Sequence, residues 1–264
     1  MNIDEGRKFA VITGGSSGIG YEFAKVCAEQ NLEVLIVADH GADEAAERLR
    51  AGGAAVTALQ ADLSTFDGNE GVASTVLQRS QPVDVLALNA GKGVAGPFLD
   101  TELERDLALI QLNIGSVIHL SKRLLPAMVT RGEGRVLITS SVAGTMPGPY
   151  YATYAASKAY LLSFAEAIRY ELKDTGVSVT ALLPGPTDTE FFDRARMQDT
   201  PVAEARKDDP AEVARDAFQA LMAGDDKVVA GSVKNLLQAA AARLAPEKFK
   251  AARHAAQTKP TDQE

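Results

Sequence analysis

The chain has 264 residues, of which 46% are hydrophobic and 23% are charged, and this balance excludes a chain dominated by disorder. The formal net charge of −8, with acidic residues spread along the chain, argues against a nucleic-acid partner or an anionic membrane surface, because both require clustered Lys and Arg. The single cysteine, Cys27, excludes a disulfide framework, and no apolar run reaches the ~18 residues of a membrane-spanning helix. We therefore expect one cytoplasmic domain over residues 1–264.

The first unit of the chain is an apolar run at residues 9–13, a glycine-rich turn at residues 13–20 and a helix-forming segment at residues 21–30. In this order, glycines let the backbone approach a phosphate closely, and the amino terminus of the following helix receives the negative charge. Taken alone, the turn is equally compatible with an ordinary tight turn.

Apolar runs and helical patterns alternate along the rest of the chain. The further runs are at residues 34–38, 54–61, 83–88, 135–139, 177–183 and 227–231. This alternation predicts an α/β fold with a doubly wound parallel sheet of about seven strands, of the Rossmann type. Gly14, Asn89 and Ser141 each follow a strand, so we expect them at the carboxyl edge of the sheet, where ligands of such folds bind.

Asp39 follows the second strand, roughly 20 residues after the glycines, where dinucleotide-binding folds place an acid that binds a ribose hydroxyl. A solvated residue at a strand end is the alternative.

The helical and irregular segments carry further expectations. Residues 103–128 predict two long helices with one wide apolar face, in which Asn113 is either a functional residue or merely exposed. Residues 191–208 are weakly patterned and predict a lid over the substrate, while residues 233–257 predict two short helices on the body or on a partner chain. We expect residues 258–264 to form a frayed tail. The three histidines are isolated in sequence, so no metal site is predicted.

Tyr154 and Lys158 lie four residues apart in a helix-forming segment, so their side chains share one helix face. An adjacent cation favours the phenolate, so we expect the pKa of Tyr154 to be lowered toward neutral. Ser141, at the end of the fifth strand, is the polar group that we expect nearby.

Together these motifs closely resemble the short-chain dehydrogenase/reductase family over nearly the whole chain. The matching pieces are Thr-Gly-x-x-x-Gly-x-Gly at residues 13–20, Asp62-Leu63, Asn89-Ala90-Gly91, Asn113, Ser141, Tyr154-x-x-x-Lys158 and Pro184-Gly185. The resemblance implies hydride transfer between a nicotinamide cofactor and a ketone or secondary alcohol, with Tyr154 as general acid and base. It makes Asn113, Ser141, Tyr154 and Lys158 the catalytic residues.

The family's roles carry over onto these positions. Ser141 would hold the carbonyl oxygen, Lys158 would lower the pKa of Tyr154 and bind the nicotinamide ribose, and Asn113 would fix a water that relays protons to Lys158. The implied cofactor-binding residues are Gly14, Ser16, Ser17, Gly18, Ile19, Gly20, Asp39, Asp62, Leu63, Asn89, Ala90, Gly91, Tyr154, Lys158, Pro184, Gly185, Thr187 and Thr189. One departure is Leu88, where family members commonly have asparagine.

The chain matches neither the NAD pattern nor the NADP pattern of the family at the end of the second strand. Many NAD-dependent relatives have an aspartate where Ala38 stands, and many NADP-dependent relatives have an arginine where Asp39 stands. We favour NAD, because a carboxylate at Asp39 would repel a 2′-phosphate and no arginine is nearby to bind it. Ser17 or His40 could instead support NADP.

A fold alone does not prove a function, so the sequence leaves alternatives to the oxidoreductase open. The chain could be a non-catalytic NAD(P)-binding sensor or scaffold, or could perform dehydratase or epimerase chemistry. A largely apolar substrate pocket is expected from Val94, Phe98, Met146, Pro147, Tyr151, Phe191, Phe192 and Met197. The resemblance also implies a homodimer or homotetramer formed through residues 103–128 and the Tyr154 helix.

Overall fold

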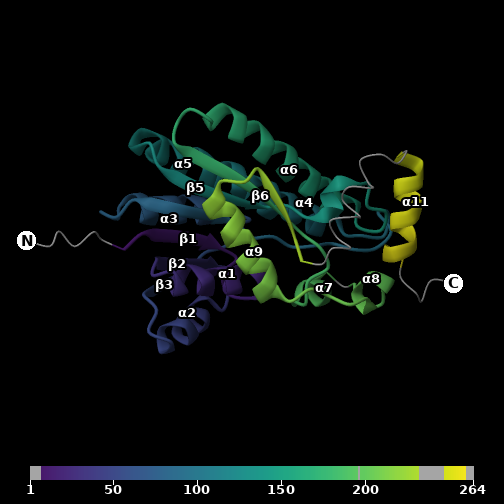
Figure 1. Ribbon diagram of the computed structural model, residues 1–264. Coiled ribbons are helices and arrows are strands. Elements are labelled where there is room, and N and C mark those ends of the chain that lie inside the picture. Colours follow the sequence, from purple (N-terminus) through teal and green to yellow (C-terminus); the bar gives the residue numbers. More distant parts are fainter. Residues whose placement is uncertain (1–6, 196, 232–246, 260–264) are drawn as a thin grey trace, which may run out of the picture.

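The computed structural model describes residues 7–195, 197–231 and 247–259, and its centre is a parallel sheet with helices on both faces (Figure 1). The seven strands have the order β3-β2-β1-β4-β5-β6-β7, and every neighbouring pair is parallel. The strands are β1 (Phe9–Thr13), β2 (Glu33–Ala38), β3 (Val56–Gln60), β4 (Val83–Leu88), β5 (Gly134–Thr139), β6 (Val177–Pro184) and β7 (Lys227–Ala230). The predicted doubly wound sheet is confirmed.

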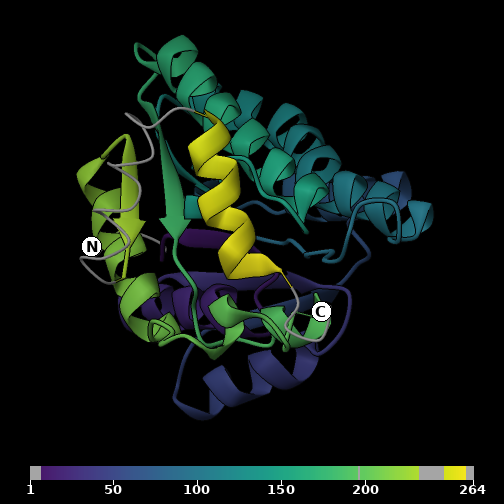
Figure 2. The same ribbon diagram turned by 90° about the vertical axis from the view of Figure 1, so that its right-hand side faces the viewer.

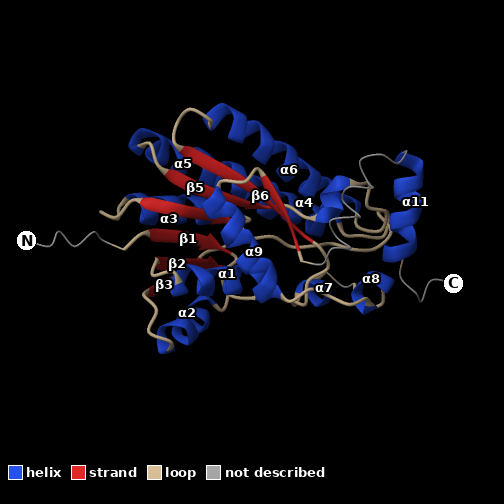
Figure 3. Cartoon of the chain, in the orientation of Figure 1, coloured by secondary structure: helices blue, strands red, loops and turns tan. Residues whose placement is uncertain are grey.

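The helices form the two outer layers, as the colouring by secondary structure shows (Figure 3). One layer contains α1 (Gly18–Glu29), α2 (Ala42–Ala51) and α9 (Pro210–Ala223). The other contains α3 (Phe66–Leu77), α4 (Leu103–Ile110), α5 (Ser116–Arg131) and α6 (Ala152–Leu172). Within the described ranges, no helix combines the length and the apolar character needed to cross a bilayer.

Strand β1 shows why both layers are needed. Phe9 and Val11 pack into the core beneath α3, α5 and α6, whereas Ala10 and Ile12 pack into the core beneath α1 and α9. Successive side chains of a strand point to opposite faces, so a strand without polar residues requires cover on both sides. The continuous apolar run therefore determines the three-layer arrangement.

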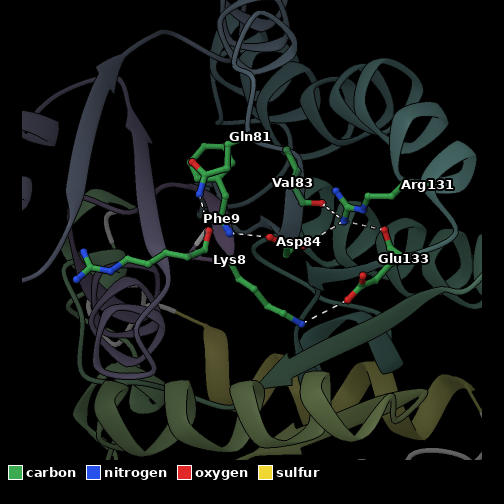
Figure 4. Close-up of polar contacts among 8 residues, drawn as sticks. Lys8, Phe9, Gln81, Val83, Asp84, Arg131 and Glu133 are labelled. Carbon is green, nitrogen blue, oxygen red and sulfur yellow. Dashed lines mark hydrogen bonds and ion pairs between the residues drawn. The ribbon is translucent and has the colours of Figure 1, made fainter. Parts of the chain in front are cut away.

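A polar network joins the amino-terminal ends of the central strands (Figure 4). The Phe9 amide donates to Asp84 Oδ2 at 2.7 Å, and Arg131 donates to Asp84 Oδ1 at 3.2 Å and to the Val83 carbonyl at 2.7 Å. Lys8 forms an ion pair with Glu133 at 3.4 Å. This network fixes the edge of the sheet that lies opposite the polar strand ends.

The segments beyond the sheet lie across its carboxyl edge. Two short helices, α7 (Phe191–Arg194) and α8 (Pro201–Glu204), occur within the expected lid segment. Helix α11 (Glu247–Thr258) lies near them beyond the strand ends, and the view from that side shows it crossing in front of the sheet (Figure 2). The far amino-terminal end of the sheet lies on the opposite side of the molecule (Figure 1).

Several expected boundaries change. Residues 103–128 contain α4, a π-helical turn (Gln111–Gly115) and α5. Helix α6 ends at Leu172, and Gly176, with φ of +77°, follows a turn and leads into β6. Thr258, expected in a frayed tail, is the buried last residue of α11. The other helix expected in residues 233–257 and the tail residues 260–264 lie outside the described residues.

Candidate active site

A cavity of about 850 Å³ opens at the carboxyl edge of the sheet. Gly14 after β1, Asn89 after β4 and Ser141 after β5 all line it, as expected from the parallel topology. Of the site residues expected from the sequence, Asn113 alone lies behind the wall; the others line the cavity, namely Gly14, Ser16, Ser17, Gly18, Ile19, Gly20, Asp39, Asp62, Leu63, Asn89, Ala90, Gly91, Ser141, Tyr154, Lys158, Pro184, Gly185, Thr187 and Thr189.

Ser141, Tyr154 and Lys158 converge in this cavity from β5 and α6. The Ser141 hydroxyl accepts from the Ala143 amide at 3.1 Å, which caps a 3₁₀ turn (Val142–Thr145) and fixes the side chain. The Lys158 ammonium lies 5.7 Å from the centre of the Tyr154 ring and donates to the Thr139 carbonyl at 2.9 Å. A hydroxyl, a phenol and a cation are therefore held at one place.

The pKa of Tyr154 differs from the expectation. Burial raises the pKa of the phenol to about 12, and a hydrogen bond with Ser141 opposes this increase. The Lys158 ammonium points to the Thr139 carbonyl, and burial lowers its own pKa to about 8. The expectation of a near-neutral phenol was wrong, since sequence spacing reveals proximity but not desolvation.

Asn113 is fully buried in the π-helical turn, so the expectation of a merely exposed residue is excluded. Its Oδ1 accepts from the Lys92 amide at 2.9 Å, and its Nδ2 donates to the Lys92 carbonyl and to Ser157 Oγ, both at 3.0 Å. A Cβ placed on Gly91 would lie 3.2 Å from Asn113 Oδ1 and 3.4 Å from Lys158 Nζ. Asn113 thus fixes the backbone after β4 directly beside Lys158. Single π turns inside α-helices are frequent at functional sites.

The glycine turn is packed so tightly that only glycine fits at two of its positions. Gly14 has φ of +66°, and a Cβ on Gly20 would lie 2.1 Å from the Gly14 carbonyl oxygen and 2.5 Å from Asn89 Nδ2. Asn89 holds the turn from the other side, since its Nδ2 donates to the carbonyls of Thr13 at 3.3 Å and Gly14 at 3.4 Å. Its Oδ1 accepts from Thr139 at 3.1 Å, so one amide joins the ends of β1, β4 and β5.

The amino terminus of α1 fits a diphosphate. Ser17 is its N-cap but makes no side-chain capping bond, and the first turn carries no acidic residue. The amide N–H groups of this turn and the positive end of the helix therefore face the cavity without a competing carboxylate. Thr189 closes the turn from the β6 side, because a Cβ on Gly18 would lie 2.9 Å from its methyl group.

Asp39 and Asp62 follow β2 and β3 at the far end of the cavity. Asp39 is exposed and pairs with His40 at 2.7 Å. Asp62 accepts from the Ser64 hydroxyl at 2.7 Å and the Ser64 amide at 2.9 Å, and these bonds lower its pKa. The premise that no arginine is near was wrong, because α2 brings Arg48 to the Ser16 carbonyl at 3.3 Å.

A family model described as short chain dehydrogenase matches residues 8–200 of this chain. The chain belongs to the short-chain dehydrogenase/reductase family. An oxidoreductase of Salmonella typhimurium named UcpA is 33% identical over 218 residues, which are 81% of this chain and 80% of that protein. A short chain dehydrogenase of Pseudocercospora fijiensis is 34% identical over 188 residues, or 70% of this chain, but the match spans only 61% of that protein's length.

Solved structures agree with this membership. A short-chain dehydrogenase from Sphingobium yanoikuyae, solved in complex with NADPH, is similar with a TM-score of 0.78 and 30% identity, over 84% of this chain and 87% of that one. This short-chain dehydrogenase/reductase is therefore an NAD(P)-dependent oxidoreductase.

Sequence reasoning missed the residues of the cavity that come from distant parts of this dehydrogenase. His254 and Gln257 of α11 line the cavity, as do Arg105 of α4 and Arg206 after α8. His254, taken as isolated, hydrogen-bonds to Tyr151, which lies 103 positions earlier. Helix periodicity could not predict this contact, because it indicates which side of a helix is buried but not which other segment packs against that side.

The apolar lining is mostly as expected. Six of the eight expected residues line the cavity, namely Val94, Met146, Tyr151, Phe191, Phe192 and Met197. Phe98 is instead 65% exposed, and Pro147 contributes its carbonyl oxygen to a hydrogen bond with His254.

Proposed function

We propose that this dehydrogenase interconverts a ketone and a secondary alcohol, with Tyr154 as the general acid and base. The observation that carries the proposal is the convergence of Ser141, Tyr154 and Lys158 on one cavity whose other end is the glycine turn. The nicotinamide cofactor, when bound, supplies or accepts the hydride.

In the reducing direction, Tyr154 Oη donates its proton to the carbonyl oxygen of the substrate. The Ser141 hydroxyl donates a hydrogen bond to the same oxygen and stabilises the negative charge that develops on it. Lys158 has a pKa near 8, so its amine carries a proton at neutral pH and can return one toward the tyrosine. Asn113, by family analogy, fixes a water in this relay.

The cofactor assignment follows the same positions. The amino terminus of α1 would hold the pyrophosphate, Asp62 and Leu63 would contact the adenine, and Thr187 and Thr189 would face the nicotinamide amide. Ser16, Gly18, Ile19, Ala90, Gly91, Pro184 and Gly185 would complete the cofactor wall. Segment 191–208 acts as a substrate lid, supported by the Phe191 ring, which lies 5.1 Å from the Tyr154 ring.

A ketone panel assayed with NADH and NADPH tests both the reaction and the cofactor. We expect reduction of medium-sized hydrophobic ketones, with kcat/KM for NADH exceeding that for NADPH by about tenfold, because the Asp39 carboxylate repels a 2′-phosphate. The nearby Arg48 side chain would attract the 2′-phosphate of NADPH, so the preference for NADH stays moderate.

An Asp39→Asn variant should narrow the ratio of kcat/KM for NADH to kcat/KM for NADPH. The control variant Asp174→Asn, at an exposed site after α6, should leave this ratio unchanged. A strong preference of the wild type for NADPH would exclude the role assigned to Asp39. If no ketone is turned over with either cofactor while both bind, the protein is a sensor or scaffold.

Assembly as a homodimer or homotetramer through α4, α5 and α6 is also proposed. The support is an apolar stripe on α4 that lies open, with Leu103, Leu107 and Ile110 exposed by 64%, 52% and 39%. We expect light scattering to give a dimer or tetramer, and Leu107→Asp to shift it toward the monomer. A monomeric wild type at micromolar concentration would contradict this assembly.

A further inference from the structure

A chain of hydrogen bonds ties α11 to the wall of the cavity beside the catalytic tyrosine. His254 Nδ1 lies 2.8 Å from the Pro147 carbonyl oxygen, and His254 Nε2 contacts the Tyr151 hydroxyl. One helical turn later, the Thr258 hydroxyl donates to the Pro149 carbonyl at 2.9 Å. His254, Thr258 and Tyr151 are all largely buried.

The direction of each bond follows from the chemistry of the groups. A carbonyl oxygen only accepts, so the hydrogen of the imidazole must be on His254 Nδ1. Burial lowers the pKa of His254, so the ring is neutral at pH 7 and Nε2 is an acceptor. Tyr151 is therefore the donor to Nε2, and burial raises the pKa of its hydroxyl, which keeps it protonated.

This arrangement determines how Tyr151 can meet a ligand. A phenol has a single hydrogen, and that of Tyr151 is committed to His254, so toward the cavity its oxygen can only accept. The Tyr151 ring lies 5.9 Å from the Tyr154 ring and is itself part of the cavity wall. The Tyr154 and Tyr151 hydroxyls also interact electrostatically, so the Tyr151 acceptor lies near the group that would protonate the reacting carbonyl.

We propose that Tyr151, oriented by His254, selects substrates that carry a hydroxyl or N–H group close to the reacting carbonyl. This inference rests on the proposed ketone reduction and deepens it. Met146, Phe191 and Met197 also line this cavity, so the favoured substrate carries its hydrogen-bond donor beside hydrophobic groups. An isosteric substrate without the donor leaves the buried acceptor unpaired, and such mismatches are costly in enzyme sites.

The test compares hydroxyketones with their methyl ethers, which fill similar space but cannot donate. The two probe pairs are 2-hydroxy-1-phenylethanone and 3-hydroxy-1-phenylpropan-1-one, each with its methyl ether, and acetophenone is the reference. For at least one pair we expect wild-type kcat/KM to favour the hydroxyketone by about tenfold, mainly through KM, which corresponds to about 1.4 kcal/mol.

Three variants identify the source of this preference. Tyr151→Phe keeps the ring and should bring the ratio to about one. His254→Phe should also bring the ratio to about one, because the released Tyr151 hydroxyl can then donate to an ether oxygen. His254→Gln should keep part of the preference for the hydroxyketone, since its amide oxygen accepts from Tyr151. Tyr170→Phe, at an exposed tyrosine near the far end of α6, is the matched control and should leave the ratio unchanged.

The outcomes separate the inference from the proposed function. If the wild type reduces acetophenone but treats both members of each pair alike, or if its preference survives Tyr151→Phe, the inference is wrong while ketone reduction stands. Lower melting temperatures of the Tyr151 and His254 variants with an unchanged ratio would show a purely structural clamp and would also overturn it. If no ketone is reduced with either cofactor, the proposed function itself fails and the inference falls with it.

Discussion

Replacing Tyr154 by phenylalanine is expected to lower kcat/KM for ketone reduction by roughly 10³-fold, the size of a general-acid contribution. The ring contacts with Tyr151 and Phe191 persist in the variant, so the wall of the cavity stays intact. Only the proton donor is removed. Because the phenol has a pKa of about 12, it is protonated throughout the neutral range and is ready to donate.

The measurement is steady-state kinetics combined with cofactor titration by fluorescence. Cofactor affinity should change by less than about threefold, since Lys158 and the glycine turn are untouched. Tyr150→Phe is the matched control, because this neighbouring tyrosine lacks a lysine four residues later and should retain activity. Substantial activity in Tyr154→Phe would place the acid elsewhere.

A Gly20→Ala substitution is expected to abolish cofactor binding and to destabilise the fold by about 2 kcal/mol, as forced overpacking does. The added methyl group would lie 2.1 Å from the Gly14 carbonyl oxygen, and that atom belongs to backbone. Neither partner can move freely, since Asn89 holds the turn against β1 and β5. The turn must open, and the amide groups at the start of α1 then lose their alignment.

Thermal unfolding and NADH titration measure the two effects. Gly71→Ala is the matched control, because a Cβ at this position of α3 meets nothing within 4 Å. There the substitution should stabilise the helix by about 0.5–1 kcal/mol, since glycine is unfavourable in helix interiors. Normal cofactor affinity in Gly20→Ala would show that the tight turn is dispensable for binding.

The parts predictable from the sequence are those that depend on local pattern and topology. Apolar runs such as residues 9–13 identify buried parallel strands, and parallel strands bring Gly14, Asn89 and Ser141 to one edge. The Tyr154 and Lys158 spacing places both side chains on one helix face. These consequences require no knowledge of which surfaces pack together.

The parts that sequence reasoning missed depend on burial and on contacts between distant segments. Desolvation raises the pKa of Tyr154, where the spacing from Lys158 predicted a decrease. The π turn buries Asn113, although its residues show the same apolar period as the flanking helices. Arg48 reaches the Ser16 carbonyl, and His254 reaches the cavity, only because α2 and α11 dock where they do.

The amino-terminal network of the sheet also bears on how the chain folds. The bond between the Phe9 amide and Asp84 spans 75 positions, and β1 pairs with β2 on one side and β4 on the other without any hairpin. The chain reaches β4 only after β3 and α3. Central strand β1 is therefore paired on one side only until β4 has been synthesised and has joined the sheet. Non-local pairing of this kind raises contact order and slows folding. A transient apolar strand edge is thus built into the assembly of this sheet, and it makes early intermediates the species most prone to aggregate.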